Sequence, residues 1–179
     1  MDIYIAPLKF SNALLLGDII SELSNRFFSK INLIEMQLNV GKYLSKERGQ
    51  YYSTGLIADA MNITGNYSGK IIILTEVDLY VPVLTFIFGE AQLNGKHSIV
   101  SACRLHEEFY SGKSDDKILF ERLMKEILHE LGHTYGLRHC VNWDCVMHTS
   151  PGIEEVDIKG RDYCKRCASI VEGYKSPYF

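Results

Sequence analysis

The sequence predicts an α+β or α/β fold in which helices pack on a β-sheet. The expected elements run in the order strand, helix, several strands, helix and then a loop-rich tail, which is typical of these classes. The length of 179 residues, with 46% hydrophobic and 23% charged residues, suits one globular domain. The chain has no internal repeat, low-complexity stretch or Pro/Gly-rich linker that would divide it.

The first two thirds of the chain carry short strand patterns and one clear helix pattern. Leu15, Ile19, Leu23 and Phe27 recur at helical spacing and predict an amphipathic helix over Ala13–Phe28. Asn94-Gly95 is a turn signal between the last two expected strands. The expected strands are Asp2–Ala6, Ile31–Val40, Lys70–Leu74, Leu84–Gly89 and Ser98–Leu105, with a helical turn at Ile57–Met61 and a short C-terminal helix around Cys167–Glu172.

A longer helix is expected from Asp115 to Tyr135. Ser114 is its expected N-cap, and Asp115 and Asp116 lie in the first turn, where the helix dipole favours negative charge. Gly136 is expected to end the helix, because a left-handed terminal residue is least costly as glycine. The residues expected to face the core are Phe120, Leu123, Ile127 and Leu131.

Charge and hydropathy give no support to a nucleic-acid or membrane partner. Nineteen basic and 22 acidic residues give a net charge of −3, which provides no electrostatic signal for nucleic-acid binding. The longest apolar stretch, Leu79 to Phe88, is too short to span a bilayer as a helix, and the N-terminus lacks the pattern of a signal peptide. We therefore expect a cytoplasmic protein, monomeric and without a membrane partner, whose thiols stay reduced.

The most specific motif lies at the end of the longer helix. His129, Glu130, His133, Gly136 and His139 form the pattern H-E-x-x-H-x-x-G-x-x-H. His129 and His133 are four residues apart and share one helix face, so both imidazoles can bind one Zn²⁺. The turn at Gly136 can return His139 to the same ion. Three neutral ligands leave the open position that a catalytic zinc needs, and Glu130 is placed as a general base.

Four of the five cysteines form a second cluster. Cys140 and Cys145 bracket four residues, and Cys164 and Cys167 form a C-x-x-C pair. This spacing predicts a closed four-cysteine structural zinc site. A redox pair, two disulfides or unrelated buried thiols are the alternatives, although a redox pair is usually found in a thioredoxin-like context that this sequence lacks.

Together these motifs resemble the archaemetzincin family of the metzincin metallopeptidases. Metzincins follow the histidine motif with a methionine turn, which Cys145-Val146-Met147 would form. The resemblance extends upstream to Tyr80–Glu90 and Arg104–Tyr110. The 16 residues between Met147 and Cys164 are one fewer than the family pattern has, which affects only a loop length.

The resemblance implies a mostly parallel twisted sheet with one antiparallel edge strand above a cleft and the active-site helix below it. The expected subdomains are residues 1–139, with the sheet and the active-site helix, and 140–179, with the methionine turn and the cysteine site. The implied cofactors are two zinc ions per chain. The implied activity is peptide hydrolysis. One activity of this kind is that of an aminopeptidase acting on small peptides. An edge strand within Leu84–Gln92 would hold the substrate extended.

Two other function classes compete with a zinc peptidase. The first is a catalytically latent zinc-binding protein of the same fold with a regulatory or peptide-binding role, although the intact Glu130 favours an enzyme. The second is a zinc-ribbon-like nucleic-acid module, which would need a basic face. Its candidate cations are Lys159, Arg161, Lys165 and Arg166, which are balanced by Glu154, Glu155, Asp157 and Asp162.

Four further residues carry weaker expectations. Tyr135 could stabilise an oxyanion, but packing is the commoner role of such a tyrosine. His148 is expected to be solvated or to support a ligand, and Trp143 to pack over the cysteine site. Cys103, in an apolar strand, is expected to be an inert buried thiol.

Overall fold

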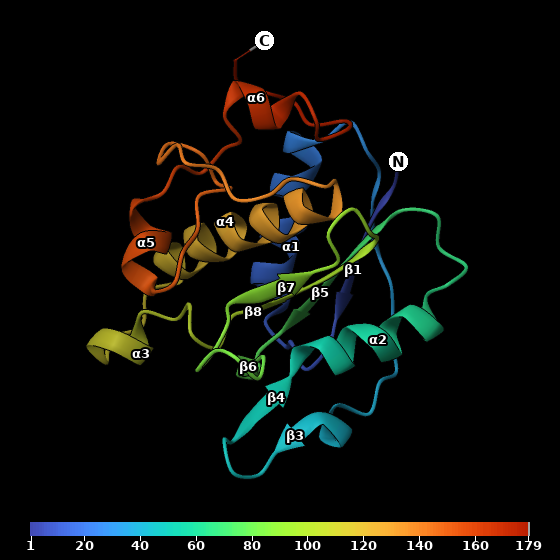
Figure 1. Cartoon of the computed structure of the whole chain (residues 1–179), viewed down its shortest axis with the longest axis vertical. Coiled ribbons are helices and arrows are strands. Elements are labelled where there is room, and N and C mark those ends of the chain that lie inside the picture. Colours follow the sequence, from blue (N-terminus) through green and yellow to red (C-terminus); the bar gives the residue numbers. More distant parts are fainter. Residues whose placement is uncertain (179) are drawn as a thin grey trace.

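A five-stranded sheet organises the computed structural model, which describes residues 1–178 (Figure 1). The strand order is β2-β1-β5-β8-β7, in which only β7, at one edge, is antiparallel to its neighbour. The expected mostly parallel sheet with an antiparallel edge strand is therefore confirmed. The strands are β1 (Ile3–Pro7), β2 (Ile31–Leu33), β5 (Lys70–Thr75), β7 (Gly89–Ala91) and β8 (His97–Ser101).

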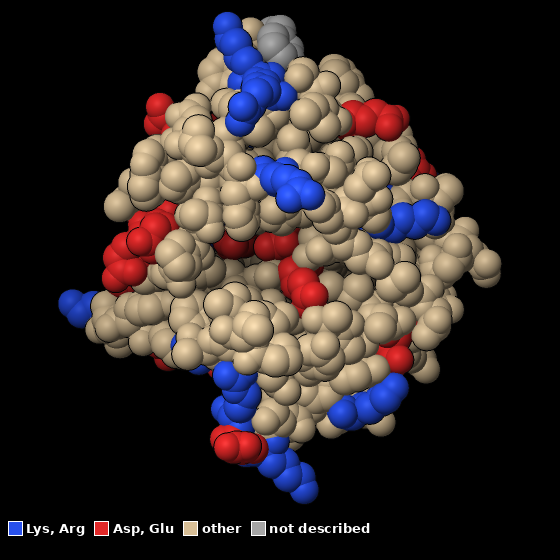
Figure 2. All heavy atoms as spheres, viewed as in Figure 1, with Lys and Arg blue, Asp and Glu red and all other residues tan. Residues whose placement is uncertain are grey.

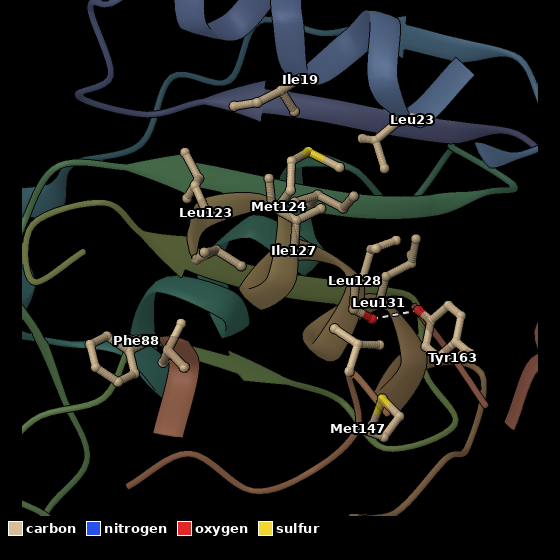
Figure 3. Packing of buried hydrophobic residues seen from close by; sticks show 14 of the residues in the cluster. Ile19, Leu23, Phe88, Leu123, Met124, Ile127, Leu128, Leu131, Met147 and Tyr163 are labelled. Atoms are coloured by element: carbon tan, nitrogen blue, oxygen red, sulfur yellow. Dashed lines mark hydrogen bonds between the residues drawn. The ribbon is translucent and has the colours of Figure 1, made fainter. Parts of the chain in front are cut away.

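Helices cover both faces of this sheet. Helices α1 (Ala13–Arg26) and α4 (Asp116–Thr134) share one core with Ile72 and Leu74 of β5, and α2 (Ser53–Ile63) shares the other core with Ile71 and Ile73. Successive side chains of a strand point to opposite faces, so β5 is apolar throughout because both faces are covered. Figure 3 shows side chains of α1 and α4 pointing into the same layer, among them Ile19, Leu23, Leu123 and Ile127.

Both ends of α4 are fixed by hydrogen bonds. The carboxylate of Asp115 accepts hydrogen bonds from the backbone of Lys117 and Ile118, so Asp115 is the N-cap and the expectation of Ser114 is wrong. At the other end, Lys70 Nζ donates to the carbonyl oxygens of Thr134 and Gly95 at 2.7 and 2.8 Å. A cation at this end also complements the helix dipole.

Several expected elements differ in length from those observed. The strand expected to reach Val40 ends at Leu33. Ile34 N–H still donates to the Ile5 carbonyl of β1 at 2.9 Å, and after it the chain leaves β1. The strand expected over Leu84–Gly89 begins only at Gly89, and Ile87 makes an isolated bridge to Leu79. The last expected strand, from Ser98 to Leu105, is also shorter, since β8 ends four residues before Leu105.

Four helical segments and a small second sheet complete the chain. Helix α2 has 11 residues, where the sequence indicated only a turn, because Gly, Thr and Asn weaken its local helical signal. A three-stranded sheet of β3 (Leu44–Ser45), β4 (Gln50–Tyr52) and β6 (Leu79–Tyr80) lies beside it. The remaining helices are η1 (Val40–Tyr43), α3 (Glu108–Ser111), α5 (Ile153–Ile158) and α6 (Lys165–Ala168), of which α6 replaces the helix expected over Cys167–Glu172.

The C-terminal tail packs along α4, on the side away from the sheet. Met147, Val156 and Tyr163 of the tail are fully buried and belong to the same core as α4. The Tyr163 hydroxyl donates a hydrogen bond to the carbonyl of Leu128 (Figure 3). Residue 179, the last of the expected 140–179 subdomain, lies outside the described residues. Within residues 1–178, no helix is both long enough and apolar enough to cross a bilayer.

Candidate metal centre

Helix α4 and the turn after it bring three imidazoles together. His129 and His133 lie one turn apart on α4, with ring centroids 4.7 Å apart. Gly136 takes φ of +90°, a left-handed conformation that glycine adopts without strain, and thereby reverses the chain. His139 then lies with its ring 5.3 and 5.1 Å from those of His129 and His133. One nitrogen from each ring lies within 4.8 Å of the other two.

Two of the imidazoles are oriented by backbone carbonyls. His129 Nδ1 lies 2.8 Å from the Val146 oxygen, and His133 Nδ1 lies 2.7 Å from the Leu137 oxygen. These contacts make each Nδ1 a donor, so each neutral ring carries its lone pair on Nε2. The two Nε2 atoms are 3.1 Å apart. Two lone pairs at this distance repel each other unless a cation lies between them, and the donor set therefore fits a Zn²⁺ ion.

Desolvation favours the neutral form of these imidazoles, most strongly for His129, which is buried, while His133 is half-buried and His139 is exposed. Desolvation lowers the pKa of His129 well below its usual value, and the Lys159 ammonium lowers it further. Desolvation also lowers the pKa values of His133 and His139. Because only a neutral imidazole binds a metal, all three rings are in the binding form at neutral pH.

Glu130 lies beside the histidines, under the edge strand. A Cβ added to Gly89 of β7 would lie 2.6 Å from Glu130 Cγ, so only glycine lets β7 approach this side chain so closely. Burial raises the pKa of Glu130 well above its usual value, and the neighbouring carboxylate of Glu126 raises it further. A divalent cation next to the carboxylate would lower that pKa again.

An open cleft of about 960 Å³ surrounds these groups. One wall is the segment 84–91 and the other includes residues 149–151, with α4 between them. Figure 2 shows acidic side chains gathered in a hollow of this face. The acidic residues that line the cleft are Glu90, Glu126 and Glu130, and its one lining guanidinium is that of Arg138. Sequence reasoning missed Glu90, Glu126 and Arg138, which carry no motif of their own.

The four clustered cysteines also converge. Their sulfur atoms lie within 4.8 Å of one another, and those of Cys140 and Cys164 are 4.0 Å apart. A tetrahedral zinc with bonds of about 2.3 Å places its sulfurs about 3.8 Å apart, which agrees with this spacing. All five cysteines are free, so the two-disulfide alternative does not describe this structure. Cys103 is the one cysteine outside the cluster; it is half-buried, and burial raises the pKa of its thiol.

The segment after the histidines joins the two clusters. The backbone N–H of Cys140 donates to the Met147 carbonyl at 2.8 Å, and that of His148 donates to the Cys145 carbonyl at 2.9 Å. The side chain of Met147 is fully buried against α4. Because Cys140 directly follows His139, the same hydrogen bonds position the third imidazole.

The weaker candidates lie outside the cleft. The Tyr135 ring lies beneath Lys70 Nζ, 4.5 Å from it, and its buried hydroxyl has no partner among the described residues. His148 stacks on Trp143 at 3.8 Å and its Nδ1 lies 3.0 Å from the Cys140 carbonyl oxygen, so both residues support the cysteine segment. Tyr135 was singled out for its position inside the histidine motif, and that position does not determine where its side chain points.

Comparison with known proteins places the chain in a family. The profile of Peptidase family M54 matches residues 19–173. The archaemetzincin of Pyrococcus horikoshii is 39% identical over 166 residues, which cover 87% of this chain and 88% of that relative. The archaemetzincin of Methanopyrus kandleri is 40% identical over 128 residues, 72% of this chain and 69% of that relative.

Solved structures of two related proteins have the same fold as this chain. The structure of Archaeoglobus fulgidus archaemetzincin, determined with malonate, has a TM-score of 0.80 and 30% identity, covering 96% of this chain and all of that one. A zinc-dependent peptidase from Methanocorpusculum labreanum has a TM-score of 0.83 and 27% identity, covering 95% of this chain and all of that one. With its histidine and cysteine groups, the chain belongs to peptidase family M54, the archaemetzincins, and is a zinc metallopeptidase.

Proposed function

We propose that this protein hydrolyses peptide bonds at a zinc ion held by His129, His133 and His139, with Glu130 as the general base. The observation that carries the proposal is the convergence of three imidazole nitrogens, two of them oriented through Nδ1, beside a buried carboxylate in one open cleft. Zinc, when bound, polarises the scissile carbonyl and makes the attacking water more acidic. The Glu130 carboxylate takes the proton of that water and delivers it to the leaving nitrogen.

The edge strand β7 is proposed to hold the substrate backbone. Gln92 N–H donates to His97 O, and Ser101 N–H donates to Phe88 O, so positions 88, 90 and 92 bond to β8. In an antiparallel pair the intervening residues point their N–H and C=O groups the other way. Gly89 and Ala91 therefore present these groups to the cleft side, where an extended peptide can add as a further strand.

The substrate is proposed to be a small peptide cut from its amino end. The carboxylate of Glu90 lines the cleft and accepts hydrogen bonds from the hydroxyls of Ser53 and Thr54. No Lys or Arg among residues 1–178 forms an ion pair with it. An oriented anion without a cation partner suits the ammonium of a peptide N-terminus.

A second zinc ion is proposed at Cys140, Cys145, Cys164 and Cys167, where it would be a structural zinc that stabilises the C-terminal tail. The same proposal divides the chain into an upper subdomain of residues 1–139 and a lower one of 140–179. The four unpaired thiols suit a reducing compartment, and we propose a monomer in the cytoplasm.

Hydrolysis of matched peptides tests the proposal. Glu130→Gln should abolish cleavage while zinc content stays at two per chain, and Glu121→Gln, a change of a half-exposed carboxylate on the same helix, should keep both. Full activity of the Glu130→Gln variant with zinc bound would contradict the general base. For the aminopeptidase action, N-acetylation of the peptide should abolish cleavage, and equal rates for free and acetylated peptides would contradict it.

A further inference from the structure

A buried ion pair lies against the first histidine of the metal centre. Lys159 Nζ is 2.7 Å from Glu126 Oε1 and 3.4 Å from His129 Nδ1. The Lys159 side chain is 0% exposed and that of Glu126 is 5% exposed. Within residues 1–178, no other group donates a hydrogen bond to the Glu126 carboxylate. A buried ion pair of this kind seldom contributes much to the free energy of unfolding. Its position next to His129 therefore indicates a role at the metal centre.

The backbone on both sides of Lys159 is fixed. Lys159 is the C-cap of α5, and its N–H donates to the Glu155 carbonyl of that helix at 3.0 Å. The next residue, Gly160, donates to Trp143 O at 2.8 Å, and a Cβ there would lie 2.2 Å from Asp144 O. Only glycine allows this approach. The Lys159 side chain therefore starts from a fixed backbone position, and its fully buried stem places the ammonium against Glu126 and His129.

Glu126 is placed to reach the metal centre. It precedes His129 by three residues and Glu130 by four, so it lies on the same face of α4. It also lines the cleft that contains the three histidines. Carboxylate oxygen is a common zinc ligand, and a three-histidine site has one position free for it. If Glu126 bound there, the site would be closed to water and substrate.

We propose that Lys159 is a positioning residue that holds the Glu126 carboxylate away from the three-histidine site and so keeps its fourth position open. The inference rests on the proposed function, since it requires a zinc ion at the histidines. A charged carboxylate in a buried site needs a compensating charge. With Lys159 present its partner is the ammonium. Without Lys159, a metal ion at the histidines of the same cleft is a cation that this carboxylate can bind.

A purely supporting role for Lys159 predicts the opposite result. If the ion pair only braces His129, its removal loosens that ligand, and zinc leaves faster; loss of such outer contacts weakens zinc binding by about 10–100-fold. If Lys159 restrains Glu126, its removal adds a ligand and zinc leaves more slowly. The direction of the change in zinc release thus separates the two roles without reference to peptide cleavage.

The experiment measures release of the chelator-labile zinc from Lys159→Met and from Lys159→Met/Glu126→Gln. We expect release from the single variant to slow by about tenfold or more, the scale on which a neighbouring group alters zinc affinity. The double variant should return to the parent rate, because an amide competes poorly for zinc. Lys125→Met is the matched control: Lys125 also ties α4 to the α5 segment, through Val156 O and Asp157 O, but pairs with no carboxylate at the site.

Cobalt substitution gives a second readout. Azide, which binds at an open coordination position, should shift the visible spectrum of the parent cobalt protein and of the double variant but not that of Lys159→Met. Faster zinc release from Lys159→Met, or an azide shift equal to that of the parent, would overturn the inference. A parent protein without any labile zinc would overturn the proposed function as well, so the two failures are distinguishable.

Glu126→Gln keeps the inference testable if Lys159→Met does not fold. The amide oxygen can still accept from Lys159, and the parent carboxylate is not a ligand under this proposal. Zinc release within about twofold of the parent and an unchanged azide shift are expected. Release about tenfold faster would show that the Glu126 carboxylate itself retains the metal, and would overturn the inference.

Discussion

The sulfur of Met147 lies against Gly132, in the last turn of α4. A Cβ added to Gly132 would lie 2.4 Å from Met147 Sδ and 3.0 Å from Tyr163 Cε1. Both of these side chains are fully buried, so neither has room to move away. A glycine inside a helix costs stability, and here that cost permits the C-terminal tail to pack directly beneath the turn that carries His129 and His133.

Gly132→Ala should therefore destabilise the protein although alanine is the better helix former. Overpacking of a filled core costs about 1–3 kcal/mol. Gly17→Ala is the matched control, since a Cβ at Gly17 of α1 meets no atom within 4 Å. It should stabilise the fold by about 0.5–1 kcal/mol. Urea unfolding of the two variants measures both effects, and a Gly132→Ala variant as stable as the control would contradict the packing argument.

The buried carboxylate of Glu130 should make the stability of the zinc-stripped protein pH-dependent. Because its pKa is raised on folding, the folded state holds a proton that the unfolded state releases above its ordinary pKa of about 4.3. The contribution of Glu130 to stability is therefore present at low pH and is lost as pH rises. Glu130→Gln does not ionise, so its stability relative to the parent should increase as pH rises from 4.5 to 7.

Urea unfolding after removal of the labile zinc, at several pH values and constant ionic strength, measures this difference. The histidines, whose lowered pKa values favour the folded state as pH rises, are present in both proteins and cancel in the comparison. Reloading zinc should reduce the difference, because the cation favours the ionised carboxylate. A difference between the variants that stays constant with pH would contradict the burial effect on Glu130.

Ala91→Pro should weaken substrate binding without disturbing the sheet. The N–H of Ala91 points away from β8, so proline removes a bond to the substrate and none to β8. One lost hydrogen bond of about 1.4 kcal/mol corresponds to about a tenfold fall in kcat/KM. Ala91→Ser retains the N–H and should keep the parent value. Steady-state kinetics with an intact zinc content checks this, and equal losses in both variants would contradict backbone recognition at β7.

Cys164→Ser should remove one zinc ion and destabilise the tail. Structural zinc contributes directly to folding, so loss of one thiolate should lower the melting temperature and loosen the segment that positions His139. Cys103→Ser is the control, because Cys103 lies outside the cluster. Native mass spectrometry and thermal unfolding measure both variants. Two zinc ions on the Cys164→Ser chain would contradict the four-cysteine assignment.

Much of the metal centre was predictable because its signals are local. The helix over Asp116–Thr134 agrees with its apolar spacing, and Gly136 ends it as expected. By contrast, the sequence indicated only a helical turn where α2 lies, and a strand where the long loop before β7 lies. Their conformations depend on packing against β6 and β8 rather than on their own residues, and a strand of three residues has too few positions to show an alternating pattern.

The sequence by itself determined the groups that can bind metal and the fact that they converge. The helical period and one glycine turn bring three histidines within reach of each other, and short covalent spacings do the same for each cysteine pair. Only the tertiary structure decided what surrounds them. Lys159 meets Glu126 across 33 residues, Gly89 covers Glu130, and Met147 lies against Gly132. Such contacts follow from how distant segments pack against one another, which no local pattern records.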